Sequence, residues 1–312
     1  MDISSPAHAS RATAITTAKR WHPYLAAGVT VVLWASAFPG IRASLGAYSP
    51  AHVALLRYAT ASLALAIYAA VTHMPLPQWR DVPAFFALGI IGISFYNVAL
   101  NTGEVSVPSA VASFIIAAAP IFMALQALML LGERLRGWGW LGIGLSFAGV
   151  AVMSLRGSHG GTVDWRVVLV LLAAVAQSVY SIGQKRLLRR YSAFACTAYA
   201  IWAGTLALLI FVPGLVPAMR AAPASATLAV IYLGIFPGAI AYVAWSQALA
   251  RLTAATAASF LYGVPIIALL IAWVWLGEVP MPLTLAGGML VIAGVVIVNL
   301  RSRLPVRAQP TE

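Results

Sequence analysis

Four polar side chains in the second half of the chain recur at the spacing of one helix face. Gln177, Tyr180, Ser181 and Gln184 occupy positions i, i+3, i+4 and i+7 of an otherwise apolar stretch. Their amides and hydroxyls are able to bind the ammonium and carboxylate of a zwitterion. Polar groups that face lipid are costly, so such a stripe should face the interior of a helix bundle. It therefore predicts one wall of a binding cavity.

Aromatic and polar residues in four other apolar stretches are further candidates for this cavity. Their rings would hold an apolar side chain of a ligand. Taken singly, each is better explained as a helix–helix contact or part of an interfacial aromatic belt; taken as a set, the 177–184 stripe favours the cavity. The further candidates are Trp34, Ser36, Phe38, Tyr96, Asn97, Asn101, Tyr242, Trp245, Ser259 and Tyr262.

One arginine and two prolines also lie inside apolar stretches. Arg57 either extends toward the headgroups or acts as an interior cation for a substrate carboxylate. Pro120 and Pro265 lie about halfway along their stretches, and each removes a backbone donor and crowds the carbonyl four residues earlier. They predict either a pair of hinges or a pair of static kinks.

The remaining residue types argue against catalysis. All 7 acidic residues (Asp2, Asp81, Glu104, Glu133, Asp164, Glu278 and Glu312) lie in tails, loops or the ends of apolar stretches. The histidines lack metal-ligand spacing, and Cys196 has no second cysteine. We expect no catalytic residue, metal or cofactor, and no group at the membrane midplane that titrates near neutral pH. Glu133 and Glu278 are expected to interact with the amides of the helix that follows each of them.

The elements that position these residues are membrane spans. The chain has 312 residues, of which 62% are hydrophobic and 8% charged, against about 25% charged in soluble domains. The net charge of +12 does not indicate nucleic acid, because the basic residues lie between apolar runs. Residues 1–23 are predicted to be a cytoplasmic N-terminal tail, of which the first 20 residues are expected to be disordered, and 303–312 a cytoplasmic C-terminal tail. Ten stretches are apolar enough to span: 24–45, 50–71, 83–103, 107–131, 137–156, 166–185, 193–213, 225–249, 254–276 and 281–300.

The two halves of the chain repeat one another. "ASFIIAAAPIFMALQALMLLGE" at 112–133 matches "ASFLYGVPIIALLIAWVWLGE" at 258–278, with the same spacing from proline to glutamate. Each repeat, 24–157 and 158–302, holds five spans, so the second must enter the membrane inverted, as in many transporters. Fourteen Lys and Arg residues lie on one side and four on the other, which places both termini in the cytoplasm.

The chain resembles the drug/metabolite transporter superfamily, EamA type. The segments that carry the resemblance are "WASAFPGIRAS", "LLRYATASLALA" and the proline-to-"LGE" block. Within that superfamily it is similar to the YddG-type aromatic amino-acid exporters. The resemblance implies ten helices in two inverted repeats and a cavity lined by the first four helices of each. The segment "AQSVYSIGQKR" at 176–186 departs from its mate in the first repeat. The motif residues that carry over are Trp34, Ser36, Phe38, Arg57, Pro120 and Glu133, with Pro265 and Glu278 as repeat mates.

We therefore predict an all-α polytopic protein of a bacterial inner membrane that exports metabolites by alternating access. The predicted substrates are neutral or zwitterionic amphipathic molecules, with aromatic and other apolar amino acids first, driven by their own gradient. Drug-like compounds or a different small metabolite are the alternative substrates, and a channel or non-transporting scaffold is the alternative from another class. A small-molecule substrate and membrane lipid are the expected partners of a monomer or weak homodimer, with no nucleic acid.

Overall fold

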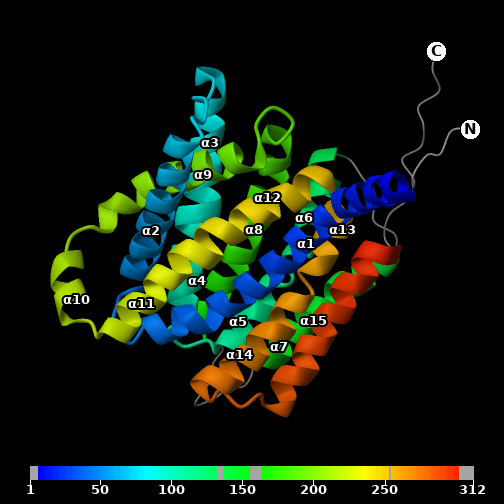
Figure 1. Cartoon of the computed structure of the whole chain (residues 1–312). Helices are drawn as coiled ribbons and strands as arrows, with labels where there is room; N and C mark the ends of the chain where they lie inside the picture. The colour runs from blue at the N-terminus through cyan, green and yellow to red at the C-terminus, as the bar shows by residue number, and fades with distance from the viewer. Residues whose placement is uncertain (1–5, 132–136, 155–163, 253, 302–312) are drawn as a thin grey trace, which may run out of the picture.

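The computed structural model is a bundle of helices, described for residues 6–131, 137–154, 164–252 and 254–301 (Figure 1). The first half contains α1 (Pro6–Ser44), α2 (Pro50–Val71), α3 (Val82–Gly89), α4 (Tyr96–Gly103), α5 (Ser109–Ile116), α6 (Ala119–Leu131) and α7 (Gly137–Ser154). The second contains α8 (Arg166–Leu187), α9 (Ala193–Leu208), α10 (Leu215–Ala221), α11 (Ala224–Leu233), α12 (Ala241–Arg251), α13 (Ala254–Phe260), α14 (Gly263–Leu276) and α15 (Pro282–Arg301).

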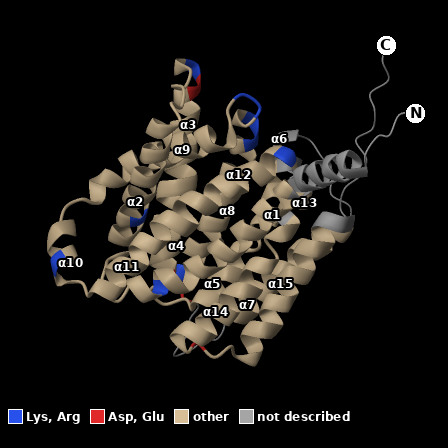
Figure 2. Ribbon diagram, viewed as in Figure 1, with Lys and Arg blue, Asp and Glu red and all other residues tan. Residues whose placement is uncertain are grey.

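Within the described residues, each of the ten predicted stretches lies mainly on helical backbone. By length and composition, 7 helices of the described ranges are able to cross a membrane, and three shorter apolar helices accompany them: Gly137–Met153, Gly263–Leu276 and Pro282–Val298. Figure 2 shows charged residues mainly near the helix ends, with long uncharged stretches between them. Large apolar side chains face outward, as Leu63 (63% exposed) and Val274 (85% exposed) do. Such an apolar exterior is typical of helices surrounded by lipid.

The N-terminal tail differs from the prediction. Helix α1 begins at Pro6, so residues 6–20, expected to be disordered, belong to the helix that forms the first span. This segment contains five alanines and no glycine, and alanine has the highest intrinsic helix propensity. Composition marked the segment as polar but did not weigh this propensity.

Local residue chemistry sets several helix boundaries. Ser49 and Ser192 precede α2 and α9, and their side chains accept hydrogen bonds from the backbone N–H groups of His52 and Ala195, each at 3.2 Å. These bonds satisfy donors that a helix start leaves unpaired. Gly277 ends α14 with a φ of +67°, a conformation that side-chain-bearing residues adopt at a cost.

Two irregularities occur in both halves of the chain. A π-helical segment joins α3 to α4 (η2, Ile90–Phe95), and another joins α11 to α12 (η4, Gly234–Ile240). The other irregularity is a helix break: the gap between α5 and α6 lies just before Pro120, and that between α13 and α14 just before Pro265. The two π-helical segments, η2 and η4, lie at matching positions of the sequence repeat. The prolines remove donors that would otherwise continue each helix.

Helices α7 and α15 pack against each other through small residues. A Cβ added at Gly142 would lie 2.5 Å from the carbonyl oxygen of Gly294, and one added at Gly149 would lie 2.5 Å from that of Gly287. Between these contacts Ser146 donates a hydrogen bond to the Val291 carbonyl at 3.0 Å. The two contacts show that the helices run antiparallel. The small residues of α7 therefore serve close packing within the chain.

Candidate substrate cavity

A small cavity lies where helices of both halves meet. Its volume is about 40 Å³, which holds a few water molecules and no amino acid. Six of the predicted site residues line it: Trp34, Phe38, Arg57, Tyr96, Gln177 and Tyr242. The other lining residues are Ala37, Leu100, Ile116, Ala117, Ala119, Leu261 and Val264. The described arrangement therefore leaves too little room at this cavity for an amino acid.

Aromatic rings form one wall. The ring centroid of Trp34 lies 5.2 Å from that of Tyr242 and 5.5 Å from that of Trp245. Tyr242 also meets Tyr180 edge-on at 5.9 Å. The indole N–H of Trp34 donates to the Pro237 carbonyl in η4 at 3.3 Å, so the irregular backbone of that segment fixes the ring. Edge-to-face packing of this kind gives a rigid apolar surface.

Arg57 supplies the positive charge of the cavity. Its side chain is 2% exposed, and Nη1 donates to Asn97 Oδ1 at 3.1 Å. Asn97 in turn donates to Tyr58 Oη at 3.0 Å and to the Ile93 carbonyl at 2.7 Å. Arg57 Nε is buried with no hydrogen-bond partner. Arg57 is thus held inward rather than extended toward the headgroups, and Asn97 positions it from behind the cavity.

Gln177 supplies the complementary acceptor. It is 5% exposed and lines the cavity from α8, and its Oε1 is buried without a hydrogen-bond partner. Two residues that line the cavity thus each have a buried polar atom without a hydrogen-bond partner: Arg57 has the donor Nε, and Gln177 has the acceptor Oε1. Unpaired buried polar groups cost free energy unless a ligand or water satisfies them.

The rest of the 177–184 stripe lies behind the cavity. Gln184 Nε2 donates to Tyr180 Oη at 3.0 Å and to Ser246 Oγ at 2.6 Å. Ser246 Oγ also lies 2.6 Å from Thr197 Oγ1. These bonds join α8, α9 and α12. Ser181 is buried on the same helix and does not line the cavity.

The other predicted site residues lie away from the cavity. Ser36 Oγ bonds Tyr232 Oη at 2.8 Å between α1 and α11, and Asn101 Nδ2 donates to the Pro50 carbonyl at 3.0 Å. Trp245 packs behind Trp34. Ser259 is exposed and donates to the Thr256 carbonyl of its own helix at 2.8 Å. Tyr262 is half-buried beside the core.

The helix breaks before both prolines face the cavity. Ile116 and Leu261, whose carbonyls the two prolines crowd, both line it, as do Ala117, Ala119 and Val264. A change in bend at either break would therefore change the shape of the cavity directly. Whether Pro120 and Pro265 act as hinges stays a prediction.

The comparisons with known proteins agree with this architecture. The EamA-like transporter family matches residues 22–155 and again residues 164–300, which is one match in each half. The chain belongs to the EamA-like transporter family.

Several relatives of this EamA-like chain are transporters. It is 46% identical over 276 residues to a probable terminal-alkyne amino-acid exporter of Streptantibioticus cattleyicolor, covering 88% of this chain and 92% of that protein. It is 39% identical to the uncharacterized transporter YdfC of Bacillus subtilis, covering 86% and 88% of the two chains. A crystal structure with 21% identity superposes with a TM-score of 0.62 and covers 89% of this chain and 98% of that one. The last of these shows the shared fold.

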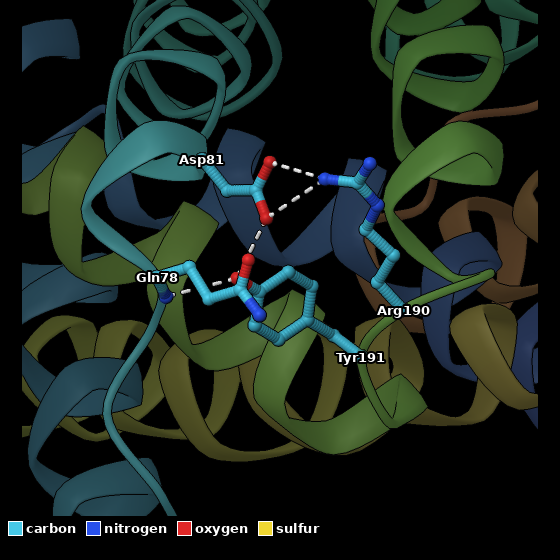
Figure 3. Close-up of polar contacts among 4 residues, drawn as sticks. All are labelled: Gln78, Asp81, Arg190 and Tyr191. Carbon is cyan, nitrogen blue, oxygen red and sulfur yellow. Dashed lines mark hydrogen bonds and ion pairs between the residues drawn. The ribbon is translucent and has the colours of Figure 1, made fainter.

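The EamA-like bundle has two ends, and we name them by their acidic residues. At the Asp81 end (residues 72–81 and 188–192), Arg190 Nη1 lies 3.1 Å and 3.4 Å from the two carboxylate oxygens of Asp81 (Figure 3). Tyr191 Oη donates to Asp81 Oδ2 at 2.8 Å and accepts from the Gln78 N–H at 3.0 Å. A groove of about 520 Å³ beside this network is lined by apolar residues of α3 and α8 and by Asp81, Arg186, Arg189 and Arg190. The opposite end is the Glu104 end (residues 45–49, 104–108, 164–165 and 277–281).

At the Glu104 end, Glu278 behaves differently from the prediction. Its Oε1 accepts a hydrogen bond from Ser109 Oγ at 3.3 Å and lies 3.9 Å from Arg42 Nε. It thus contacts side chains of α5 and α1 rather than amides of the following helix, because the turn at Gly277 directs it back over the bundle. Glu133, its repeat mate, lies outside the described residues.

Sequence reasoning missed two groups of residues. Thr197 completes the polar network behind the cavity and was not a candidate, whereas Ser246, which it contacts, shares a helix face with Tyr242 and Trp245. Ile116, Ala117 and Leu261 line the cavity although they are apolar and belong to apolar runs. Among these, Ile116 and Leu261 lie four residues before a proline, and this position was the signal that could have singled them out.

Proposed function

We propose that this EamA-like protein is a secondary transporter of a bacterial inner membrane that exports neutral or zwitterionic amphipathic metabolites by alternating access. Aromatic and other apolar amino acids are the substrates we place first. The observation that carries the proposal is that one aromatic-walled cavity is lined by Arg57 and Gln177, a cation and an amide that each have a buried polar atom without a partner.

The chemistry of these groups matches an amino-acid zwitterion. Arg57 would bind the carboxylate, since a guanidinium bonds carboxylates strongly. Gln177 Oε1 would accept a hydrogen bond from the ammonium, and the rings of Trp34, Phe38 and Tyr242 would hold the apolar side chain. The relative in Streptantibioticus cattleyicolor, described as a probable amino-acid exporter, supports the same class.

The closed cavity supports alternating access. A volume of about 40 Å³ is far below the 300 Å³ or more of typical ligand sites, so the bundle must expand to admit a substrate. We propose ten spans in two inverted repeats as the basis of this motion. The antiparallel α7–α15 contact supports this arrangement because it joins the fifth span of one repeat to the fifth span of the other. The two π-helical segments and the two proline breaks support it because they occur at equivalent positions of the repeat. With both termini in the cytoplasm, the Asp81 end faces the cytoplasm and the Glu104 end faces the periplasm.

Counterflow in proteoliposomes tests this function. Vesicles that contain the purified protein and unlabelled phenylalanine should take up labelled phenylalanine faster than vesicles without internal substrate, because only an alternating carrier is stimulated from the opposite side. Gln177→Ala should reduce this counterflow, and Leu169→Ala, on the same helix but outside the cavity lining, should not.

A panel of amino acids and drug-like cations identifies the substrate class. Stimulation by cations but not by amino acids would assign the alternative, a drug exporter. Flux without stimulation would indicate a channel, and no flux for any compound would indicate a scaffold. Each of these three results contradicts the proposal.

A further inference from the structure

Glu104 is buried without partners at the end of α4. Its side chain is 0% exposed, and both carboxylate oxygens are buried with no hydrogen-bond donor. Glu104 lies one residue beyond the span Trp79–Gly103, in agreement with the sequence, which places it at the end of an apolar stretch. An ionised carboxylate in such a place costs several kcal/mol unless a cation or proton compensates it.

The nearby cations do not pair with this carboxylate. Arg42 of α1 directs its Nη1 to the backbone carbonyls of Glu104 and Val105 and its Nε toward Glu278. Arg57 of α2 bonds Asn97. Both ion pairs of the described residues, Arg42–Glu278 and Arg190–Asp81, omit Glu104.

The charged and titratable groups around Glu104 oppose one another. Burial, and next the negative charge of Glu278, raises the pKa of the Glu104 carboxyl well above its ordinary value, while Arg42 and Arg57 act in the lowering direction. The phenol of Tyr96, on α4, is a further titratable group that interacts with the Glu104 carboxyl. Burial exceeds the effect of the two arginines because neither of them bonds the carboxylate.

Glu104 also lies in line with the cavity. Asn97, Asn101 and Glu104 occupy positions i, i+4 and i+7 of one helix face, which spans about 10 Å along the axis. Asn97 holds Arg57 at the cavity, and Asn101 Oδ1 is buried without a partner between them. A polar column therefore runs from the cavity to the Glu104 end.

We propose that Glu104 is a proton-binding site that is occupied while the Glu104 end is closed and empty once that end opens. The inference rests on the proposed function, since it assumes that the bundle opens and closes. In the closed state, the proton removes the charge that burial opposes. Opening exposes the carboxyl to water, where it ionises and releases the proton to that side.

This linkage fixes the direction of the pH effect. The closed state holds the proton more tightly than the open state, whose carboxyl has an ordinary pKa of about 4.3. The closed state is therefore fully favoured below that value, and it loses stability as pH rises through the higher pKa of the closed form. Between the two values the open-to-closed ratio rises by up to about tenfold per pH unit.

Distance measurements between two spin labels at the Glu104 end test this proposal. Val105→Cys and Val279→Cys, both at exposed positions, are labelled in a Cys196→Ser background. The fraction of molecules with the longer distance should rise at least threefold from pH 5 to pH 8. Glu104→Gln, which cannot ionise, should hold the short distance at every pH. Asp164→Asn is the matched control: Asp164 lies at the same end and accepts bonds from Ser106 and the Arg166 N–H, so its removal should leave the pH response intact.

Glu278→Gln provides a second test that does not alter the buried residue. Removing this neighbouring charge should shift the midpoint of the transition to lower pH. A pH-independent distance in the unmodified sequence, an unchanged response in Glu104→Gln, an unmoved midpoint in Glu278→Gln, or loss of the transition in Glu278→Gln would each overturn the proposal. Phenylalanine counterflow by the same proteins separates this failure from failure of the transport function, because counterflow persists if only the proton site is wrong.

Discussion

The two ends of the bundle treat a buried acidic side chain in opposite ways. At the Asp81 end, the carboxylate receives bonds from Arg190 and Tyr191, and these bonds join two loops from different halves of the chain. At the Glu104 end, the carboxylate receives none, although Arg42 lies next to its backbone. Closure at one end satisfies a charge, whereas closure at the other end isolates one.

This difference indicates two kinds of closure. Arg190 is 65% exposed, so its ion pair with Asp81 is open to solvent and holds the two loops weakly and reversibly, since solvent-exposed ion pairs contribute about 1 kcal/mol or less. An isolated carboxyl in a dry site makes closure depend on its protonation. We therefore expect salt to modulate the Asp81 end and pH to modulate the Glu104 end.

The largest effect should come from the cation between the two ends. Arg57→Met removes the charged donors of the cavity, and a bond to a charged group is worth about 1.5–3 kcal/mol, so the affinity for phenylalanine should fall by about 10- to 100-fold. Arg42→Met, at the Glu104 end outside the cavity lining, should change affinity by less than about threefold. Equilibrium binding to purified protein measures both. Equal affinities in the two variants would show that Arg57 does not bind the substrate.

The next largest effect should come from the contact between α7 and α15. Gly149→Leu places a side chain against the Gly287 backbone in the α7–α15 contact and should destabilise the protein by about 1–3 kcal/mol. Gly144→Leu is the matched control, because no atom lies within 4 Å of a Cβ at that position. Thermal unfolding in detergent should show a lower Tm for Gly149→Leu alone. Equal Tm values would contradict the contact.

A smaller effect should follow from changing the break at the cavity. Pro265→Ala restores a backbone donor four residues after Leu261 and should slow substrate exchange by about three- to tenfold while changing affinity less, if the break acts as a hinge. Pro282→Ala, at the first residue of α15, removes a proline that interrupts no helix and should leave exchange unchanged. Weaker binding with normal exchange in Pro265→Ala would assign a static role in cavity shape.

The smallest effect should appear at the Asp81 end. Asp81→Asn removes the ion pair with Arg190, whose side chain is 65% exposed, but keeps an acceptor for Tyr191. The free energy of closure should change by no more than about 1 kcal/mol, which alters exchange by up to about fivefold. High salt should reproduce the change in the unmodified protein and have little further effect on the variant. If salt changed the exchange rate of Asp81→Asn as strongly as that of the unmodified protein, the Asp81–Arg190 pair would not be the salt-sensitive contact.

Sequence reasoning predicted the helical class and placed all ten stretches on helices because long apolar runs leave few alternatives. It also identified six residues that line the cavity, since polar or aromatic residues inside apolar runs are conspicuous. It could not tell which residues of the 177–184 stripe line the cavity, because Gln177 and Gln184 share a helix face. Only the contacts of Gln184 with Tyr180 and with Ser246 of α12 assign it to the network behind the cavity. Sequence reasoning placed Glu104 at the end of a span but not in a buried site, since position along a span does not reveal which neighbouring helices cover its end.

Distances across both ends, measured on two labelled samples under the same conditions, test the central claim of alternating access most directly. One spin-label pair, Val105→Cys with Val279→Cys, reports the Glu104 end, and a second pair, Trp79→Cys with Arg251→Cys, reports the Asp81 end in a separate sample; all four positions are exposed. Across a series of phenylalanine concentrations and pH values, the account predicts opposite changes, with the long-distance fraction rising at one end as it falls at the other. Simultaneous lengthening at both ends, or no change at either, would contradict it.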